Sequence, residues 1–114
     1  MTTSDFQRKI VTHEQLIARV VQARRGGETI VHCHGCFDIV HPGHIRYLEF
    51  ARRQGDLLIV TLTGDSDVAE GNQRPYIPQE LRAETLAALE FVDLVYIDPN
   101  PSADSVLHDV KPNV

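Results

Sequence analysis

Tryptophan is absent from the 114-residue sequence, methionine occurs once, and there are only two cysteines. Cys33 and Cys36 are too few for a disulfide scaffold, and without a secretory signal they favour free thiols in a reducing cytoplasm. No apolar run approaches the roughly 20 residues of a membrane-spanning helix. The polar start of the chain, residues 1–9, does not resemble a signal peptide. We therefore expect a cytoplasmic protein without a membrane partner.

A run of basic residues is also missing. The chain carries 11 lysines and arginines against 16 acidic residues, for a net charge of −5, whereas nucleic-acid-binding proteins usually show a basic surface. We expect no nucleic-acid partner, although a single nucleotide needs only a few amides and cations. The remaining composition, 42% hydrophobic and 24% charged, is typical of a globular protein. The length allows one domain with its own core.

Hydrophobic periodicity predicts helices alternating with short strands. Thr12 and Gln15 have the spacing of a capping box at the first helix. The apolar run 56–62 fits a parallel strand that is covered on both faces. The helix 43–54 should turn Ile45, Leu48 and Ala51 inward, and the helix 78–92 should bury one face. That face consists of Leu81, Thr85, Ala88, Leu89 and Val92. The expected helices are 12–25, 43–54, 78–92 and 102–108, and the expected strands are 29–33, 56–62 and 94–97.

This alternation predicts an α/β fold, a Rossmann-like parallel sheet with flanking helices. We expect a single domain over residues 1–114, with a helical extension at 1–27 and a partial core at 28–114. Ligands of such sheets bind beyond the carboxyl ends of the strands. The first strand should end near Cys33, so the segment 34–44 is expected at the binding edge, with residues 35–42 as a loop.

The segment His34-Gly-Cys-Phe-Asp-Ile-Val-His-Pro-Gly-His44 concentrates the residues that can carry chemistry. Pro42 suits the first turn of a helix, where free amides and the positive dipole end attract anions. Gly35 allows close approach to the backbone, and Gly43 leaves room for a phosphate. His41 and His44 share a helical face and can both donate to one anionic group. The context, after a strand and at a helix start, favours a phosphate site over two merely exposed histidines.

The stretch from Gly35 to Ala51 resembles the signature of the cytidylyltransferase-like superfamily, and most closely the adenylyltransferase domain of bacterial heptose-phosphate enzymes. Similarity continues through residues 55–65, 74–75, 81–89, 92–93 and 111–114, about four fifths of the chain. The resemblance implies a nucleotidyltransferase. Such an enzyme would transfer a nucleoside monophosphate, AMP from ATP or its CTP counterpart, to a sugar phosphate or similar small phosphorylated acceptor. It would release pyrophosphate and use Mg²⁺ with the triphosphate.

The same resemblance assigns roles to individual residues. His41 and His44 would be the catalytic residues that stabilise charge on the phosphates. Gly35, Cys36, Phe37 and Gly43 would surround the nucleotide. Asp65 and Arg82 would complete the binding site, with Arg82 meeting an anionic group of the acceptor or the triphosphate. The resemblance assigns no residue to a metal site.

Two departures from the related sequences stand out. Glu70-Gly71 occupies a place where relatives commonly carry Lys-Gly, so a carboxylate replaces a cation in that loop. The chain also stops after Lys111-Pro-Asn-Val114, where relatives continue into a strand beside the first strand. We therefore expect a fold that is incomplete at its C-terminus, with an unpaired edge at residues 29–33. Such an edge invites pairing with a second chain, so we expect a homodimer.

Three alternatives to the transferase remain. The chain could be a nucleotide-binding fragment without turnover. It could be a metal-binding module in which Cys33, Cys36, His34 and His41 hold zinc. The Cys-x-x-Cys spacing of Cys33 and Cys36 could also indicate redox chemistry, although such motifs sit at a helix N-terminus. Asp65 and Asp67 could equally form an exposed acidic loop.

Overall fold

A computed structural model describes residues 5–65, 77–100 and 102–114. Three parallel strands form its sheet: β1 (Ile30–Gly35), β2 (Leu57–Thr63) and β3 (Leu94–Asp98) lie in the order β1-β2-β3. Residue 30 pairs with residue 57, and residue 59 with residue 94. The three carboxyl ends therefore meet at one edge, and the predicted parallel α/β fold is confirmed.

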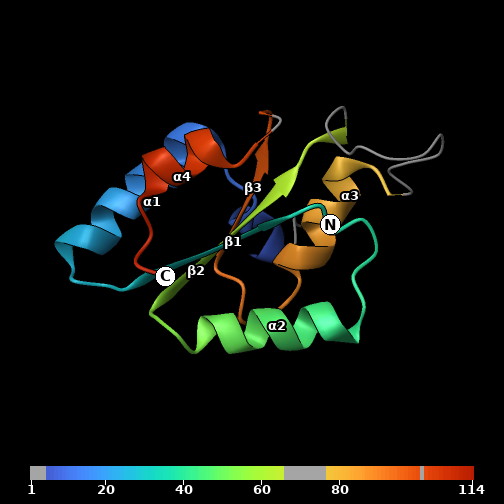
Figure 1. Cartoon of the computed structure of the whole chain (residues 1–114), viewed down its shortest axis with the longest axis horizontal. Coiled ribbons are helices and arrows are strands. Elements are labelled where there is room, and N and C mark those ends of the chain that lie inside the picture. Colours follow the sequence, from blue (N-terminus) through green and yellow to red (C-terminus); the bar gives the residue numbers. More distant parts are fainter. Residues whose placement is uncertain (1–4, 66–76, 101) are drawn as a thin grey trace.

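Helices cover both faces of this sheet (Figure 1). On one face α2 (Pro42–Arg52) and α3 (Gln79–Ala87) pack on Val31, Val60 and other apolar side chains. On the opposite face α1 (His13–Arg25) and α4 (Asp104–Val110) pack on a second apolar cluster. A short 3₁₀ helix, η1 (Asp5–Lys9), precedes α1 and contacts α3. The molecule is thus a three-layer sandwich with one core on each side of the sheet.

Local sequence signals account for the best-predicted elements. The Oγ1 of Thr12 accepts a hydrogen bond from the amide of Gln15, and the Oε1 of Gln15 accepts one from the amide of Thr12, as the capping box predicts. Residues 57–62 of β2 are all buried, which confirms the prediction of a strand covered on both faces. β1 extends two residues further than predicted, so His34 and Gly35 belong to the strand. Those two residues lie at the carboxyl end of β1.

The predicted inward face of the third helix is wrong for Leu81, Thr85 and Ala88, which are exposed, whereas Val92 is buried as predicted and Leu89 is partly buried against the core. Leu81 is 51% exposed, whereas Arg82 is 1% exposed and Ala83, Leu86 and Ala87 are fully buried. The helix also ends at Ala87. Contacts with β3, β2 and η1 determine the buried face of α3. The periodicity of the helix sequence does not predict these distant contacts. Ile45 of α2 is likewise 37% exposed, although Leu48 and Ala51 are buried as predicted.

Both edges of the sheet meet residues from near the ends of the chain. Ile10 forms a bridge with Val95, and the amide of Val11 donates to the Val95 carbonyl at 2.9 Å. At the other edge the amides of Asn113 and Val114 donate to the Ile30 carbonyl, and the amide of His32 donates to the Val114 carbonyl. The expectation of an unpaired edge along residues 29–33 is therefore wrong, because the last two residues already form backbone hydrogen bonds with β1.

The remaining predictions concern the end of the chain and the loop after β2. The last helix begins at Asp104, with Ala103 at the cap position, although Ser102 Oγ does accept from the Asp104 amide at 3.4 Å. Asp67, Glu70, Gly71 and residues 74–75 lie outside the described residues. Within the described ranges, no helix combines the length and apolar character needed to cross a membrane.

Candidate functional site

A cavity of about 500 Å³ opens where β1 ends and α2 begins. It brings together four of the predicted site residues: Gly35, Cys36, Phe37 and His44. Its other lining residues are His34, Asp38, Ile39 and Tyr47. The ring of His41 borders the same place, because its centroid lies 4.1 Å from that of His44. Asp65 and Arg82 stand behind this loop and do not line the cavity.

His41 and His44 are held by the backbone at the start of α2. His41 Nδ1 accepts a hydrogen bond from the amide of Gly43 at 2.9 Å, and His44 Nδ1 accepts one from the amide of His41 at 3.2 Å. Because each Nδ1 is an acceptor, the proton of each neutral ring is on Nε2. Both imidazoles therefore offer an Nε2–H donor, the group that a phosphate oxygen requires.

This reciprocal cap changes how the helix start can bind an anion. The amide of Gly43 donates to the His41 ring, while the amides of His44 and Ile45 donate to the His41 carbonyl at 2.9 and 3.2 Å. The expectation of free amides here is therefore wrong for these three residues, since His41 already satisfies them. The ring N–H groups and the helix dipole remain as the anion-attracting features.

Glycine is required at position 43 because of the nearby His41 ring. A Cβ at position 43 would lie 2.6 Å from His41 Cε1 and 3.0 Å from His41 Nδ1. Any side chain there would push the His41 ring out of its cap. The space that the sequence predicts for a phosphate is therefore occupied by a histidine ring, and Gly43 serves the site by positioning His41.

The loop between β1 and α2 has a constrained backbone at Phe37. Its φ is 51°, in the left-handed region that favours glycine, while the residue is only 6% exposed. Burial of that ring holds the conformation, which costs about 1–3 kcal/mol at a non-glycine residue. A Cβ on Gly35 would approach the Phe37 ring to 3.0 Å. Gly35 thus leaves room for Phe37 to pack beneath the loop.

His44 also touches this ring, at a centroid distance of 5.7 Å with an edge-on geometry. Desolvation beside the ring, together with the nearby His41, lowers the pKa of His44 below its ordinary value. His44 is consequently neutral at physiological pH and acts as a hydrogen-bond donor through Nε2.

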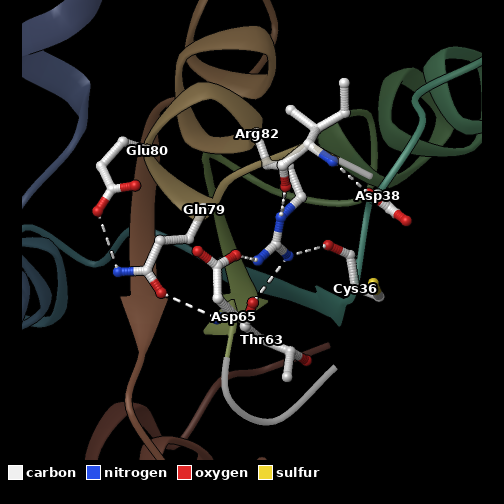
Figure 2. Close-up of polar contacts among 8 residues, drawn as sticks. Cys36, Asp38, Thr63, Asp65, Gln79, Glu80 and Arg82 are labelled. Carbon is white, nitrogen blue, oxygen red and sulfur yellow. Dashed lines mark hydrogen bonds and ion pairs between the residues drawn. The ribbon is translucent and has the colours of Figure 1, made fainter. Parts of the chain in front are cut away.

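Arg82 is the residue whose position differs most from expectation (Figure 2). Its guanidinium is buried and donates hydrogen bonds to acceptors of the protein itself, instead of extending toward a ligand. Nε donates to the Ile77 carbonyl at 2.9 Å, and Nη1 donates to the carbonyls of Cys36 and Thr63 at 2.7 and 2.8 Å. Nη2 pairs with Asp65 Oδ1 at 2.7 Å. Arg82 therefore joins the ends of β1 and β2 to the start of α3.

The bond from Arg82 to Cys36 has a consequence for the pocket. The Cys36 carbonyl and the Phe37 amide belong to one planar trans peptide, so they point in opposite directions. Because Arg82 holds the carbonyl, the Phe37 N–H points away from Arg82. Asp38 fixes the next part of the loop, since its Oδ1 accepts from the Ile77 amide at 3.0 Å. The loop is therefore oriented by α3 and by the segment before it.

The sequence predicts Asp65 as a ligand-binding residue, whereas in the structure Asp65 contacts other residues of the protein. Its carboxylate pairs with Arg82, and its amide donates to Gln79 Oε1 at 2.9 Å. Conversely, His34, Asp38 and Tyr47 line the cavity and were not among the predicted site residues. A signal existed for all three: His34 and Asp38 belong to the same motif, and Tyr47 lies three residues after His44 on one helical face.

The two cysteines do not converge on a shared centre. Both are free thiols; Cys33 is buried in the sheet and Cys36 lies in the loop. Burial raises the pKa of the Cys33 thiol, which disfavours the thiolate that redox chemistry needs. No group of three or more His, Cys, Asp or Glu side chains suited to a metal ion occurs within the described part of the chain.

A parallel sheet with a cavity beyond its carboxyl ends, and paired histidine donors at a helix start, defines a Rossmann-like domain with a candidate phosphate-binding site. A model of the cytidylyltransferase-like family matches residues 32–114. The chain therefore belongs to the cytidylyltransferase-like family, as its sequence motif predicts.

Several known proteins are similar to this chain. The bifunctional protein HldE of Alcanivorax borkumensis is 42% identical over 109 residues, which cover 94% of this chain and 23% of that protein. HldE of Campylobacter fetus is 42% identical over 113 residues, covering 97% and 24%. This chain thus spans about a quarter of the length of these relatives. The crystal structure of the lipopolysaccharide core biosynthesis protein from Thermoplasma volcanium superimposes with a TM-score of 0.70 at 30% identity, covering 76% of this chain and 71% of that one.

Proposed function

We propose that this chain forms the nucleotide-binding site of an adenylyltransferase, which transfers AMP from ATP to a sugar phosphate and releases pyrophosphate. The alternative within this proposal is a cytidylyltransferase, which would transfer CMP from CTP by the same chemistry. The observation that carries the proposal is the pair of Nε2–H donors of His41 and His44 at the edge of the cavity. Phosphoryl transfer asks a protein mainly to position the reactants and to stabilise charge.

The loop 35–39 would receive the nucleotide beside these histidines. The Phe37 amide would donate to a phosphate oxygen, and the bond from Arg82 to the Cys36 carbonyl would orient it. Gly35 and Gly43 act indirectly, because they make room for Phe37 and His41. Asp65 and Arg82 act as positioning residues behind the loop. As a phosphate oxygen of the acceptor attacks the α-phosphorus, the pyrophosphate leaves toward His41 and His44.

Mg²⁺ would enter with the triphosphate. The described residues contain no cluster that could hold the ion alone, and Mg²⁺ in such sites takes one or two carboxylates, substrate phosphates and water. Its contribution would be to neutralise charge on the leaving pyrophosphate. The free thiols of Cys33 and Cys36 fit a protein that works in the cytoplasm.

Calorimetry with ATP and CTP, followed by a pyrophosphate-release assay with a sugar 1-phosphate, tests the proposal. We expect saturable binding of one triphosphate in the presence of Mg²⁺ and pyrophosphate release that depends on the sugar phosphate. Binding without pyrophosphate release would identify a nucleotide-binding module instead. If neither triphosphate binds at millimolar concentration, the proposal is wrong.

A further inference from the structure

Two backbone amides at the start of α2 donate to histidine nitrogens that protonation would occupy. The amide of Gly43 donates to His41 Nδ1 at 2.9 Å, and the amide of His41 donates to His44 Nδ1 at 3.2 Å. Because a backbone N–H group can only donate, each Nδ1 keeps its lone pair and the proton of the neutral ring is on Nε2. An imidazolium carries a proton on both nitrogens, so protonation of either ring turns its contact into two opposed N–H groups.

These two contacts form the capping box of α2. Protonation of His41 releases the amide of Gly43, and protonation of His44 releases the amide of His41. A positive charge is also unfavourable at this place, since the N-terminus of a helix is the positive end of its dipole. The positions of both rings and the cap of α2 therefore depend on both histidines being neutral.

The two rings also oppose each other's protonation. Their centroids are 4.1 Å apart, and a like charge at that separation disfavours the charged form of its neighbour. Desolvation and, second, the nearby His41 lower the pKa of His44 below its ordinary value. His41 is exposed, so protons from the solvent reach the pair as the pH falls.

The surrounding groups offer the pair little compensation for a positive charge. Along α2, the neighbours three and four residues away on the same face are the uncharged Ile45, Tyr47 and Leu48. Across the cavity, the titratable lining residues are His34, Cys36, Asp38 and Tyr47. Asp38 is the carboxylate among them, and its Oδ1 already accepts from the Ile77 amide at 3.0 Å. Desolvation lowers the pKa of His34, so this ring is neutral at pH 7.

We propose that His41 and His44 form a proton-sensitive cap, which binds the phosphates of the nucleotide only while both rings are neutral. A phosphate oxygen that accepts from Nε2–H polarises the ring and strengthens Nδ1 as the acceptor of the backbone amide. As the pH falls, protonation releases the amides and displaces the rings from the site. Histidines that bind phosphate as cations behave in the opposite way, because the anion favours the charged form and binding takes up a proton. The inference deepens the proposed function and rests on it for the identity of the ligand.

The cap can be measured without any ligand. In ¹⁵N spectra of the labelled chain at pH 8, we expect both rings in the Nε2–H form. A scalar coupling across the N–H···N hydrogen bond should join the Gly43 amide to His41 and the His41 amide to His44, and it should disappear as the rings titrate toward pH 5. The capping box of Thr12 and Gln15 on α1 is the matched control, because its acceptors are oxygens that do not titrate. Its amide protection should not change over this range. Rings protonated on Nδ1 at pH 8 would overturn the inference.

The affinity for ATP with saturating Mg²⁺, measured by calorimetry from pH 7.5 to pH 5.5, tests the coupling to the ligand. An imidazole with the ordinary pKa of about 6.5 is only about one-tenth neutral at pH 5.5, so we expect the affinity to fall by about tenfold. His41→Asn keeps a strong N-cap that does not titrate, and its affinity should fall less. ATP titrates equally with both proteins, so the comparison removes the contribution of the ligand. Circular dichroism checks that each protein is folded at every pH.

The same titrations in two buffers of different ionisation enthalpy count the protons exchanged on binding. Relative to His41→Asn, we expect the wild type to take up no proton at pH 7.5 and to release protons at pH 5.5, because the bound rings must be neutral. Proton uptake, or an affinity that rises with acid, would overturn the inference. Absence of ATP binding at every pH would instead contradict the proposed function, while the spectra of the free chain decide the cap separately.

Discussion

At the residue scale, the paired histidines derive their chemistry from the backbone around them. Each Nδ1 of His41 and His44 accepts an amide proton, so the donor nitrogens are fixed before any ligand arrives. This preorganisation avoids the reorientation that a free imidazole would need during the reaction. It also makes both residues part of the helix cap, so that the same contact stabilises α2 and prepares the site.

The first residue-scale prediction concerns His44. In a chain with transferase activity, His44→Ala should lower kcat by about 10²- to 10³-fold, the usual effect of removing one preorganised donor, with little change in nucleotide affinity. Pyrophosphate release under saturating substrate measures it. His13→Ala, on α1 and paired with Asp109, is the control and should keep wild-type turnover. Unchanged kcat in His44→Ala would contradict the catalytic role.

The second residue-scale prediction concerns Gly43. Gly43→Val should weaken ATP binding by at least about tenfold, because the new side chain displaces the His41 ring that lies 2.6 Å from the Cβ position. Calorimetry measures the change. Gly26→Ala is the matched control, since its Cβ would meet only backbone oxygens at 3.6 and 3.7 Å. Equal affinity in Gly43→Val and the wild type would place the phosphate site elsewhere.

At the scale of elements, Arg82 attaches α3 to the carboxyl ends of two strands (Figure 2). Arg82→Leu should lower the free energy of unfolding by about 3–5 kcal/mol, because it leaves a carboxylate and buried carbonyls without their donor. Urea denaturation measures this loss. Arg53→Ala, an exposed arginine paired with Glu49, should cost about 0.5 kcal/mol or less. A similarly small cost for Arg82→Leu would refute its structural role.

His32 on β1 should make the free energy of unfolding depend on pH. The pKa of His32 falls from 6.5 to about 4 on folding, chiefly through desolvation. The unfolded chain therefore binds more protons in this window, and stability is full above pH 6.5 and is lost as the pH falls toward 4. The contribution is at most about 3 kcal/mol. Urea midpoints measured from pH 7 to pH 4 should decline less in His32→Gln than in the wild type. Parallel declines would show that His32 is not buried as a neutral ring.

At the scale of the whole molecule, α2 presents apolar side chains to solvent. Tyr47 is 53% exposed and Phe50 is 62% exposed, and both border a small cavity of about 210 Å³ that Val114 also lines. Such surfaces favour association, and two-fold symmetric pairs are the commonest closed assemblies. Self-association is therefore expected through this face of α2, since part of the β1 edge is already paired.

We therefore propose a homodimer that buries Tyr47 and Phe50. Light scattering over a dilution series should show a dimer for the wild type, and Phe50→Glu should shift it toward monomer without unfolding the chain. Leu81→Glu is the control, because Leu81 is similarly exposed but lies on α3. A wild-type chain that remains monomeric at all concentrations would contradict the proposal.

The sequence by itself determined the elements whose signals are local. The capping box of Thr12 and Gln15 and the apolar run of β2 need no distant partner to be recognised. The motif from Gly35 to His44 likewise identified the family and the location of the cavity, because a strand, a glycine-bearing turn and a helix start are contiguous in the chain. The hydrophobic pattern of α3 does not predict its buried face, because Leu81 faces solvent and Arg82 faces the core.

Only the tertiary structure decided the roles of Arg82 and His34. An isolated arginine is expected on the surface, because burying a charge is costly unless it is paired and hydrogen-bonded. Here acceptors from Cys36, Thr63, Ile77 and Asp65 converge on it, and they lie up to 46 residues away in sequence. The orientation of His34 depends in the same way on Thr61 of the neighbouring strand, whose Oγ1 lies 2.6 Å from His34 Nδ1. Local sequence specifies which groups are present, whereas the register of the sheet decides which of them meet.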